Sequence, residues 1–260
     1  MKIVKRYIKV DLIRQAIYKV LYINSNYAKR LKKFKNIHKN ERCFIIGNGP
    51  SLKIEDLERL KDEITFGTNR IFNIFNETDW RPTYYCIQDF PLINQISREI
   101  DNIKAKEKFL SINAKWKYRL SFNKNTNYFF LNTKRYYPNM PNFSSDITHE
   151  ICEGFTVTYG AMQIAMYMGF KEIYLLGVDF NYSVYKNNDG KIIKQEGVKD
   201  YFSNDNNDGL NAPNLENSYL AYKKAKEYSI KVGCKIFNST RGGKLDIFER
   251  VNLDELFINK

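Results

Sequence analysis

The chain contains few of the residues on which the commonest catalytic chemistries depend. Its 260 residues include two histidines and four cysteines, and no HxxxH, HExxH, GxSxG or paired CxxC motif occurs. Zinc hydrolysis, Ser-His-Asp acyl transfer and a disulfide framework therefore have no support in the sequence. We expect His38 and His149 to have structural roles. The cysteines are expected to be reduced, buried thiols; they are Cys43, Cys86, Cys152 and Cys234.

Long apolar runs are also absent. No stretch approaches the roughly 18 uninterrupted apolar residues of a membrane-spanning helix. Charges recur every two or three residues in the first 14 positions, which is untypical of a signal peptide, so we expect a cytoplasmic protein. Hydrophobic residues make up 43% of the chain, enough to bury a core, which excludes a disordered chain.

Charge of one sign is concentrated in one segment. The formal net charge is +13, and residues 1–42 hold thirteen Lys and Arg but two acidic residues. The remaining chain is nearly neutral. A nucleic-acid-binding domain needs a basic face on the folded domain itself, so we expect no nucleic-acid partner.

The basic segment predicts an N-terminal arm over residues 1–41. Apolar residues recur at helical spacing between Val4 and Leu21, with lysines and arginines between them, which predicts a helix over 3–23. One interpretation is a helix packed on the domain with a solvated basic face, and another is a basic arm that contacts a nucleic acid. The interpretation favoured by the charge is an amphipathic anchor, residues 1–40, on the anionic inner face of a cell membrane.

The body, residues 42–260, alternates short apolar runs with helical stretches. This alternation predicts an α/β domain with a Rossmann-like, mostly parallel sheet that is covered on both faces. The predicted strands are 43–46, 64–67, 84–87, 109–112, 128–131, 173–177 and 235–237, and the predicted helices are 54–61, 91–103, 157–168 and 215–232. The Asn/Asp-rich stretch 203–214 predicts a surface loop, a candidate lid.

Ligands of such sheets bind beyond the carboxyl ends of the strands. The first predicted strand is followed by Gly47, Asn48, Gly49, Pro50 and Ser51. Glycines let backbone N–H groups approach a phosphate, and Ser51 is suited to cap the next helix. The loop is neither GxGxxG nor a Walker A sequence, and a tight structural turn is the alternative interpretation.

Polar residues follow four further predicted strands. They are Asn69 and Arg70, Gln88 and Asp89, Gly177 and Asp179 with Tyr182 and Tyr185, and Arg241 with Lys244. Amides suit a base or ribose edge, and tyrosine hydroxyls with basic side chains stabilise a leaving phosphate without a metal ion. Asp179 and Asp89 are candidate bases, although Asp179 also suits a role in holding its own loop.

Five segments of the sequence resemble a known family. They are residues 43–52, 66–72, 78–85, 169–180 and 238–245. Together they resemble the 6-hydroxymethylpterin diphosphokinase-like domain family over about residues 42–256; this family includes the motility accessory factors of flagellin glycosylation. The first and fourth segments are also similar to those of bacterial lipooligosaccharide sialyltransferases.

The resemblance implies a Rossmann-like variant of the GT-A fold with a CMP-sugar over the 47–51 loop and Asn69. It implies nucleotide contacts for Thr156 and Thr158, and phosphate contacts for Tyr182 and Tyr185. The sialyltransferases use a histidine base before the C-terminal helix, and this chain has no histidine after His149. Asp179, Asp89 or Asp200 would have to replace it.

We therefore predict a metal-independent, inverting glycosyltransferase. It would transfer a sialic-acid-like sugar from a CMP-sugar to a glycan or lipid-linked acceptor of capsule or lipooligosaccharide at the inner membrane face. One alternative is a Mg²⁺-dependent pyrophosphokinase acting on a hydroxymethylpterin-like alcohol, with the metal on Asp89, Asp179 or Asp205/Asp208. Another is a membrane-tethered nucleotide sensor. The sugar, the acceptor and homo-oligomerisation stay open.

Overall fold

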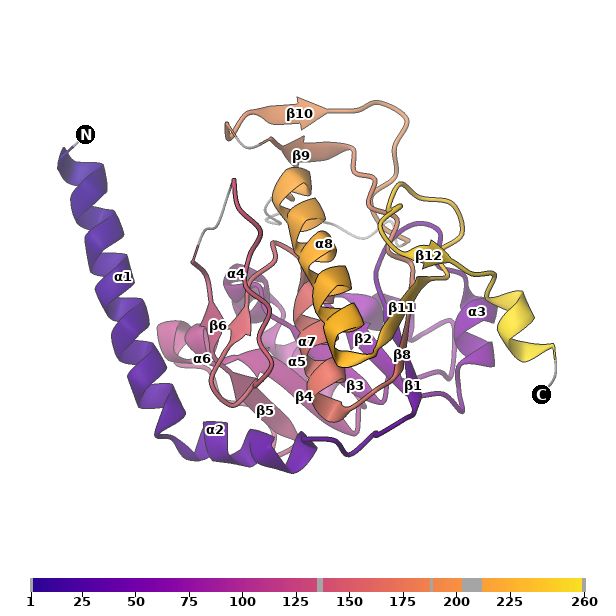
Figure 1. Cartoon of the computed structure of the whole chain (residues 1–260), viewed down its shortest axis with the longest axis horizontal. Helices are drawn as coiled ribbons and strands as arrows, with labels where there is room; N and C mark the ends of the chain where they lie inside the picture. The colour runs from indigo at the N-terminus through magenta and orange to yellow at the C-terminus, as the bar shows by residue number, and fades with distance from the viewer. Residues whose placement is uncertain (1, 135–137, 188, 203–211, 259–260) are drawn as a thin grey trace.

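The computed structural model describes residues 2–134, 138–187, 189–202 and 212–258, with side chains from residue 13 onward. Its centre is an eight-stranded sheet of order β12-β11-β8-β1-β2-β3-β4-β5, in which every pairing is parallel (Figure 1). The predicted α/β, Rossmann-like architecture is confirmed. Most of the predicted loop 203–214, with Asp205 and Asp208, lies outside the described residues.

All seven predicted apolar runs contribute to the main sheet. Its strands are β1 (Arg42–Ile46), β2 (Thr65–Thr68), β3 (Tyr84–Ile87), β4 (Glu107–Ser111), β5 (Thr126–Phe129), β8 (Glu172–Leu176), β11 (Lys235–Asn238) and β12 (Glu249–Arg250). Two small pairs were not predicted, namely β6 (Leu131–Asn132) with β7 (Ile151–Cys152), and β9 (Val184–Lys186) with β10 (Ile192–Lys194). Strands of two or three residues are too short to show a recognisable alternation.

The four helices predicted for the body are present, and one of them is divided into two. They are α3 (Ile54–Arg59), α4 (Phe90–Gln95), α5 (Ser97–Asn102), α7 (Val157–Met168) and α8 (Leu215–Val232), and α6 (Ile112–Tyr118) was not predicted. The helix expected over 91–103 is divided into α4 and α5 because Ile96, at φ −108° and ψ 30°, leaves the helical region. Three short 3₁₀ helices complete the set, η1 (Lys32–Phe34), η2 (Ile71–Ile74) and η3 (Asp254–Phe257).

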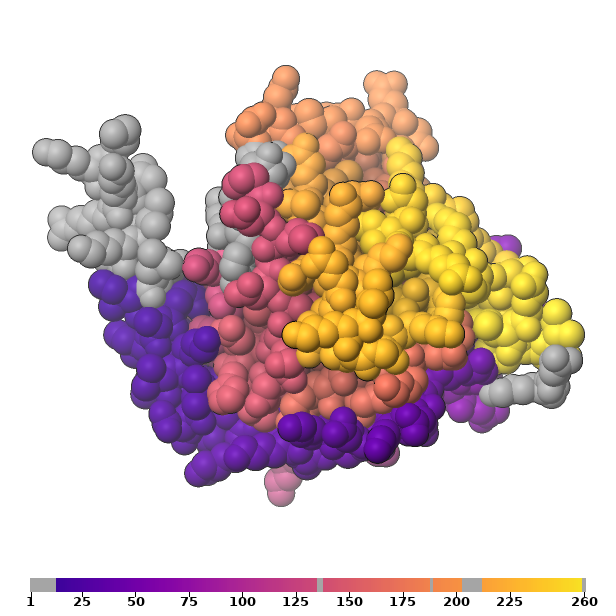
Figure 2. Space-filling model, viewed as in Figure 1, coloured from indigo at the N-terminus to yellow at the C-terminus, as the bar shows by residue number. Residues whose placement is uncertain are grey.

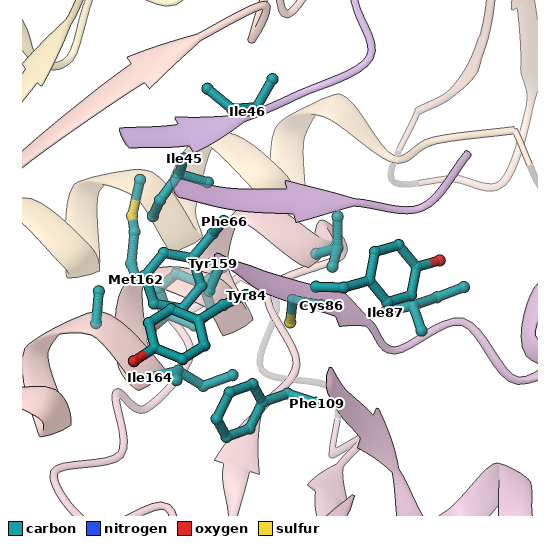
Figure 3. Packing of buried hydrophobic residues seen from close by; sticks show 14 of the residues in the cluster. Ile45, Ile46, Phe66, Tyr84, Cys86, Ile87, Phe109, Tyr159, Met162 and Ile164 are labelled. Carbon is teal, nitrogen blue, oxygen red and sulfur yellow. The ribbon is translucent and has the colours of Figure 1, made fainter. Parts of the chain in front are cut away.

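The main core lies between the sheet and α7. Figure 3 shows Ile45, Phe66, Tyr84 and Phe109, from four successive strands, packed with residues of α7 such as Met162. Burying one such side chain stabilises the fold by roughly 1.5–3 kcal/mol. All four cysteines are free and buried, as predicted.

The N-terminal segment is partly built into this core. The predicted helix is α1 (Lys2–Ile23), followed by α2 (Asn26–Leu31). Tyr22 is fully buried and its hydroxyl donates to the carbonyl oxygens of Tyr128 and Ile147, at 3.2 and 3.1 Å. Leu31 and Phe34 are also core residues. From Tyr22 onward, the predicted arm therefore shares one core with the body.

The opposite face of α1 carries an apolar stripe. Ile13, Ile17, Val20 and Leu21 have exposed fractions of 54, 54, 61 and 56%. The described part of α1 follows one edge of the molecule, and α2 continues beneath the body (Figures 1 and 2). In the described part of the chain, no helix is long and apolar enough to cross a membrane.

Candidate functional site

A cleft of about 830 Å³ opens at the carboxyl edge of the sheet. It is bounded by the residues that follow β2, β3 and β8, by the N-termini of α7 and α8, and by the β9–β10 hairpin, which projects beyond the sheet (Figures 1 and 2). Its size suits a nucleotide or a nucleotide sugar. Five of the predicted site residues line it, namely Asn69, Gln88, Asp89, Thr156 and Tyr182.

Two amide oxygens in this wall lack hydrogen bonds from the protein. Asn69 follows β2 in the left-handed region, at φ 48°, and Gln88 follows β3. Both the Oδ1 of Asn69 and the Oε1 of Gln88 are buried, and within the described residues no donor reaches either atom. An unpaired buried acceptor costs about 1–3 kcal/mol, so these two oxygens are suited to accept from a ligand's N–H or O–H groups.

Two helix caps border the cleft. Asp89 caps α4, because its Oδ1 accepts from the backbone N–H of Leu92 at 2.7 Å. Thr156 caps the twelve-residue α7, and its Oγ1 accepts from the N–H of Thr158 at 3.3 Å. Thr158 itself is buried behind the wall. The N-terminus of α7 carries a partial positive charge at the edge of the cleft.

Three tyrosines also belong to the cleft wall. They are Tyr182, Tyr201 and Tyr222, and Tyr182 interacts electrostatically with each of the other two. Burial raises the pKa of Tyr201 to about 12 and that of Tyr182 further above its usual range. These phenols are therefore neutral hydrogen-bond donors near pH 7. Tyr185, the other predicted phosphate contact, lies in β9 opposite Ile193 and does not line the cleft.

The glycine loop after β1 supports the turn after β8 rather than the cleft wall. The N–H of Gly49 donates to the carbonyl oxygen of Gly177 at 2.9 Å. A Cβ on Gly49 would lie 1.9 Å from Asp179 Oδ2, and one on Gly47 would lie 2.3 Å from the Gly177 oxygen. The glycines thus allow two chain segments to touch. This close contact agrees with the alternative interpretation of the 47–51 loop as a tight structural turn. Pro50 is part of the same turn.

Asp179 holds that turn together. Its Oδ2 accepts from the hydroxyl of Ser51 at 2.8 Å, and its carbonyl oxygen accepts from the N–H of Lys244 at 2.7 Å. Burial raises the pKa of the Asp179 carboxyl, and the Ser51 hydrogen bond opposes that rise. Asp179 does not line the cleft, so the structure places it in the loop-holding role.

Asn48 connects this turn to the cleft. Its Nδ2 donates to the carbonyl and hydroxyl oxygens of Thr68, at 3.0 and 3.1 Å. Its own carbonyl oxygen accepts from the N–H of Phe202 at 3.0 Å. The neighbouring residue, Tyr201, belongs to the wall. Asn48 therefore positions a wall residue without lining the cleft itself.

Neither predicted arginine lines the cleft. Arg241 makes a bidentate pair with Asp56, with 2.7 Å between Nη2 and Oδ1, and also contacts Asp254. These contacts raise the pKa of Arg241, and they join α3 to η3. The Nη2 of Arg70 donates to Gln95 at 3.1 Å. Arg241, expected in the catalytic site, thus lies outside the cleft wall, because a buried carboxylate elsewhere binds its guanidinium.

The family assignment comes from comparison with known proteins. The family model described as 6-hydroxymethylpterin diphosphokinase MptE-like matches residues 16–184. The chain belongs to the MptE-like family. The match begins within α1, consistent with the N-terminal segment being part of the fold. No curated protein matches the chain.

Two solved structures share the fold of this MptE-like chain. One is the MAf glycosyltransferase from Magnetospirillum magneticum AMB-1, at 15% identity and a TM-score of 0.52; the alignment covers 90% of this chain and 38% of that one. The other is the sialyltransferase CstII from Campylobacter jejuni in complex with the substrate analogue cytidine-5'-monophosphate. It has 17% identity and a TM-score of 0.50, with 82% and 85% of the two chains covered.

Several wall residues of the MptE-like chain escaped the sequence analysis. They are Glu153, Phe155, Phe180, Lys186, Tyr201, Asn217, Ser218 and Tyr222. Tyr222 lies inside α8, where helical spacing predicts burial but not what the side chain faces. Lys186 is the last residue of β9 and Tyr201 follows the β9–β10 hairpin, and the position of this hairpin depends on the folded body. The described residues contain no group of three or more His, Cys, Asp or Glu that could hold a metal ion.

Proposed function

We propose that the chain is an inverting glycosyltransferase that uses a CMP-activated, sialic-acid-like sugar without a metal ion and acts on a bacterial surface glycan. The observation that carries this proposal is the pair of buried oxygens of Asn69 and Gln88 that lack a hydrogen bond within the described residues, in a cleft wall that also contains three tyrosines. A wall that contains both hydrogen-bond acceptors and donors suits a ligand with an amino-bearing base and a phosphate. The CMP complex of the similarly folded CstII supports this choice of donor.

Each wall element has a role in that reaction. The oxygens of Asn69 and Gln88 would accept from the cytosine amino group or a ribose hydroxyl. The hydroxyls of Tyr182, Tyr201 and Tyr222 and the N-terminus of α7 would stabilise the phosphate as it leaves. Lys186 is the one basic side chain in the described part of the wall and would pair with the phosphate or the sugar carboxylate.

Thermal unfolding with nucleotides tests the donor class. A ligand at about 100 times its Kd adds roughly 2.7 kcal/mol to the free energy of unfolding and raises the Tm by a few degrees. We expect CMP to do so without Mg²⁺, and UMP and ADP to have less effect. Stabilisation by ATP alone, and only with Mg²⁺, would replace this proposal with the pyrophosphokinase.

The wall variants Asn69→Ala and Gln88→Ala make the test specific. Each removes one unpaired acceptor, so each should lower the CMP-induced rise in Tm. Asn73→Ala, in the neighbouring η2 and outside the wall, is the matched amide control. An unchanged CMP response in both wall variants would contradict the assignment of these oxygens to the nucleotide.

The location of the acceptor at an anionic membrane surface is the second part of the proposal. The exposed stripe of Ile13, Ile17, Val20 and Leu21 lies beside the basic segment 29–35, whose lysines Lys29, Lys32 and Lys35 are exposed. Apolar side chains enter the headgroup region while basic residues meet anionic lipids. A second copy of the chain would bring the same positive charge, which disfavours self-association through this face.

Vesicle flotation tests this surface. The full chain should bind vesicles that contain phosphatidylglycerol, less so at high salt, and the double variant Ile17→Ser/Val20→Ser should not. The control Ile230→Ser/Val232→Ser removes two exposed apolar residues of α8, with exposed fractions of 71 and 39%, and should bind normally. Equal binding by both double variants would contradict the membrane role of α1.

A further inference from the structure

The first turn of α7 contains a glycine that the helix itself does not require. Gly160 is the fourth residue of this twelve-residue helix, and it is buried. A glycine inside a helix lowers stability relative to alanine, because it loses more backbone entropy on folding. The backbone of Gly160 does not lie in the left-handed region, where glycine would be favoured. The reason for a glycine at this position therefore lies in its surroundings.

The side chain of Gln88 occupies the space that a side chain at position 160 would need. A Cβ on Gly160 would lie 2.7 Å from the Oε1 of Gln88. The next nearest atom is Cγ2 of Ile151, and its distance of 3.6 Å is an ordinary van der Waals contact. An alanine methyl group at position 160 would thus overlap with the amide oxygen of Gln88.

This close approach connects α7 to the cleft wall. Gln88 lines the cleft and is 6% exposed, and the first turn of α7 also contributes Thr156 and Val157 to the wall. Among the glycines in the described part of the chain, Gly160 is the one whose Cβ would meet a wall side chain. The space at Gly160 is therefore shaped for a residue of the candidate site.

The amide group is the part of Gln88 that an alanine at position 160 would displace. The backbone of Gln88 lies between β3, which ends at Ile87, and Asp89, the N-cap of α4. The side chain, by contrast, changes its position by rotation about its torsions. This displacement breaks no hydrogen bond of the Oε1, because the oxygen has none within the described residues. The change therefore alters the position of the acceptor with little effect on the fold.

Building on the proposed function, we infer that Gly160 is a positioning residue for nucleotide binding. The absence of a side chain at position 160 leaves a recess that holds the Gln88 amide in place. A glutamine side chain has several rotatable bonds, and ordering it when a ligand binds costs conformational entropy. A recess of fitting shape orders the amide before the ligand arrives, which lowers that cost. The lower helix stability at Gly160 accompanies this preorganisation.

CMP binding to Gly160→Ala in the full-length chain tests this role, by calorimetry and thermal unfolding. Without ligand, the Tm should rise by roughly 1–4 °C, because alanine favours the helix. The Kd for CMP should increase about three- to tenfold, as expected for the loss of one hydrogen bond. A glycine that served only the packing of α7 would affect the Tm and leave the Kd unchanged.

The matched control is the double variant Gly160→Ala/Gln88→Ala, in which the displaced amide is absent. Relative to Gln88→Ala, the added methyl group should change the Kd for CMP by less than about 1.5-fold. An equal increase of the Kd in both backgrounds would overturn the inference, since the methyl group would then act on the site without Gln88.

The same measurements separate this inference from the proposed function. If Gly160→Ala binds CMP like the wild type while Gln88→Ala binds it more weakly, Gly160 has no positioning role and the nucleotide proposal stands. If the wild-type chain does not bind CMP, the donor class is wrong and the inference fails with it. Should Gly160→Ala not fold, the double variant decides: its folding supports the contact with Gln88, and its failure to fold contradicts it.

Discussion

Arg241 illustrates how one side chain can serve the fold at a position where the sequence suggests catalysis. It pairs with Asp56, whose side chain is 2% exposed, so Arg241→Ala leaves a buried carboxylate unpaired. We expect a loss of about 2–4 kcal/mol in the free energy of unfolding, measured in urea, and an unchanged response to CMP. Arg59→Ala, which removes an exposed partner of Asp254, should cost much less. A lost CMP response in Arg241→Ala would return Arg241 to the site.

Asp179 makes stability depend on pH in a direction opposite to most acidic residues. Burial raises its folded-state pKa, so the folded chain holds this proton more tightly than the unfolded chain. The contribution of Asp179 to the free energy of unfolding is therefore complete at pH values below the unfolded-state pKa of about 3.9. It is lost as the pH rises through the folded-state pKa. The Asp179→Asn variant has no titrating group at this position. Its free energy of unfolding, relative to that of the wild type, should therefore increase between pH 4 and pH 7.

Urea unfolding of both proteins at several pH values measures this difference. Ser51→Ala provides an internal check, because it removes the hydrogen bond that lowers the pKa of Asp179 and should steepen the pH dependence. A difference between Asp179→Asn and wild type that stays constant from pH 4 to pH 7 would contradict the raised pKa.

At the scale of elements, we expect one carboxylate at the base of the β9–β10 hairpin to contribute to its stability. Asp200 accepts two hydrogen bonds from Ser183, next to Tyr201 in the cleft wall. Losing them in Asp200→Ala should make backbone amides 184–194 exchange about tenfold faster, since about 1.4 kcal/mol corresponds to a factor of ten. Asp189→Ala, at the exposed tip, should leave exchange unchanged. Equal exchange in both variants would mean that the hairpin is held by other contacts.

The whole molecule determines how far the N-terminal segment can be shortened. Tyr22, Leu31 and Phe34 are core residues, each worth about 1.5–3 kcal/mol, against a typical total stability of 5–15 kcal/mol. Deletion of residues 1–12 should therefore keep a cooperative melt within a few degrees of wild type. Deletion of residues 1–40 should abolish the cooperative melt. A stable chain lacking residues 1–40 would show that the predicted arm is separable from the body.

Most of the fold was predictable from the spacing of apolar residues and glycines over short stretches of the sequence. The buried strands of a parallel sheet are continuous apolar runs, and α7, α8 and the end of α8 at Gly233 follow from helical spacing and a left-handed glycine. These signals depend on neighbours within the chain. The same logic placed Asn69, Gln88 and Asp89 at strand ends, and the resemblance to the sialyltransferases pointed to Thr156; the cleft wall contains all four.

What each side chain faces was decided by the tertiary structure. The sequence by itself determined the α/β class, the element order and the strand-end polar residues, because these depend on local spacing and burial. It could not show that Asp179 meets Ser51, 128 positions away, or that Arg241 meets Asp56, 185 positions away. The sequence also did not show that Glu153 lies in the cleft wall. Contacts between residues this distant arise from packing of the whole chain, which no short window of sequence records.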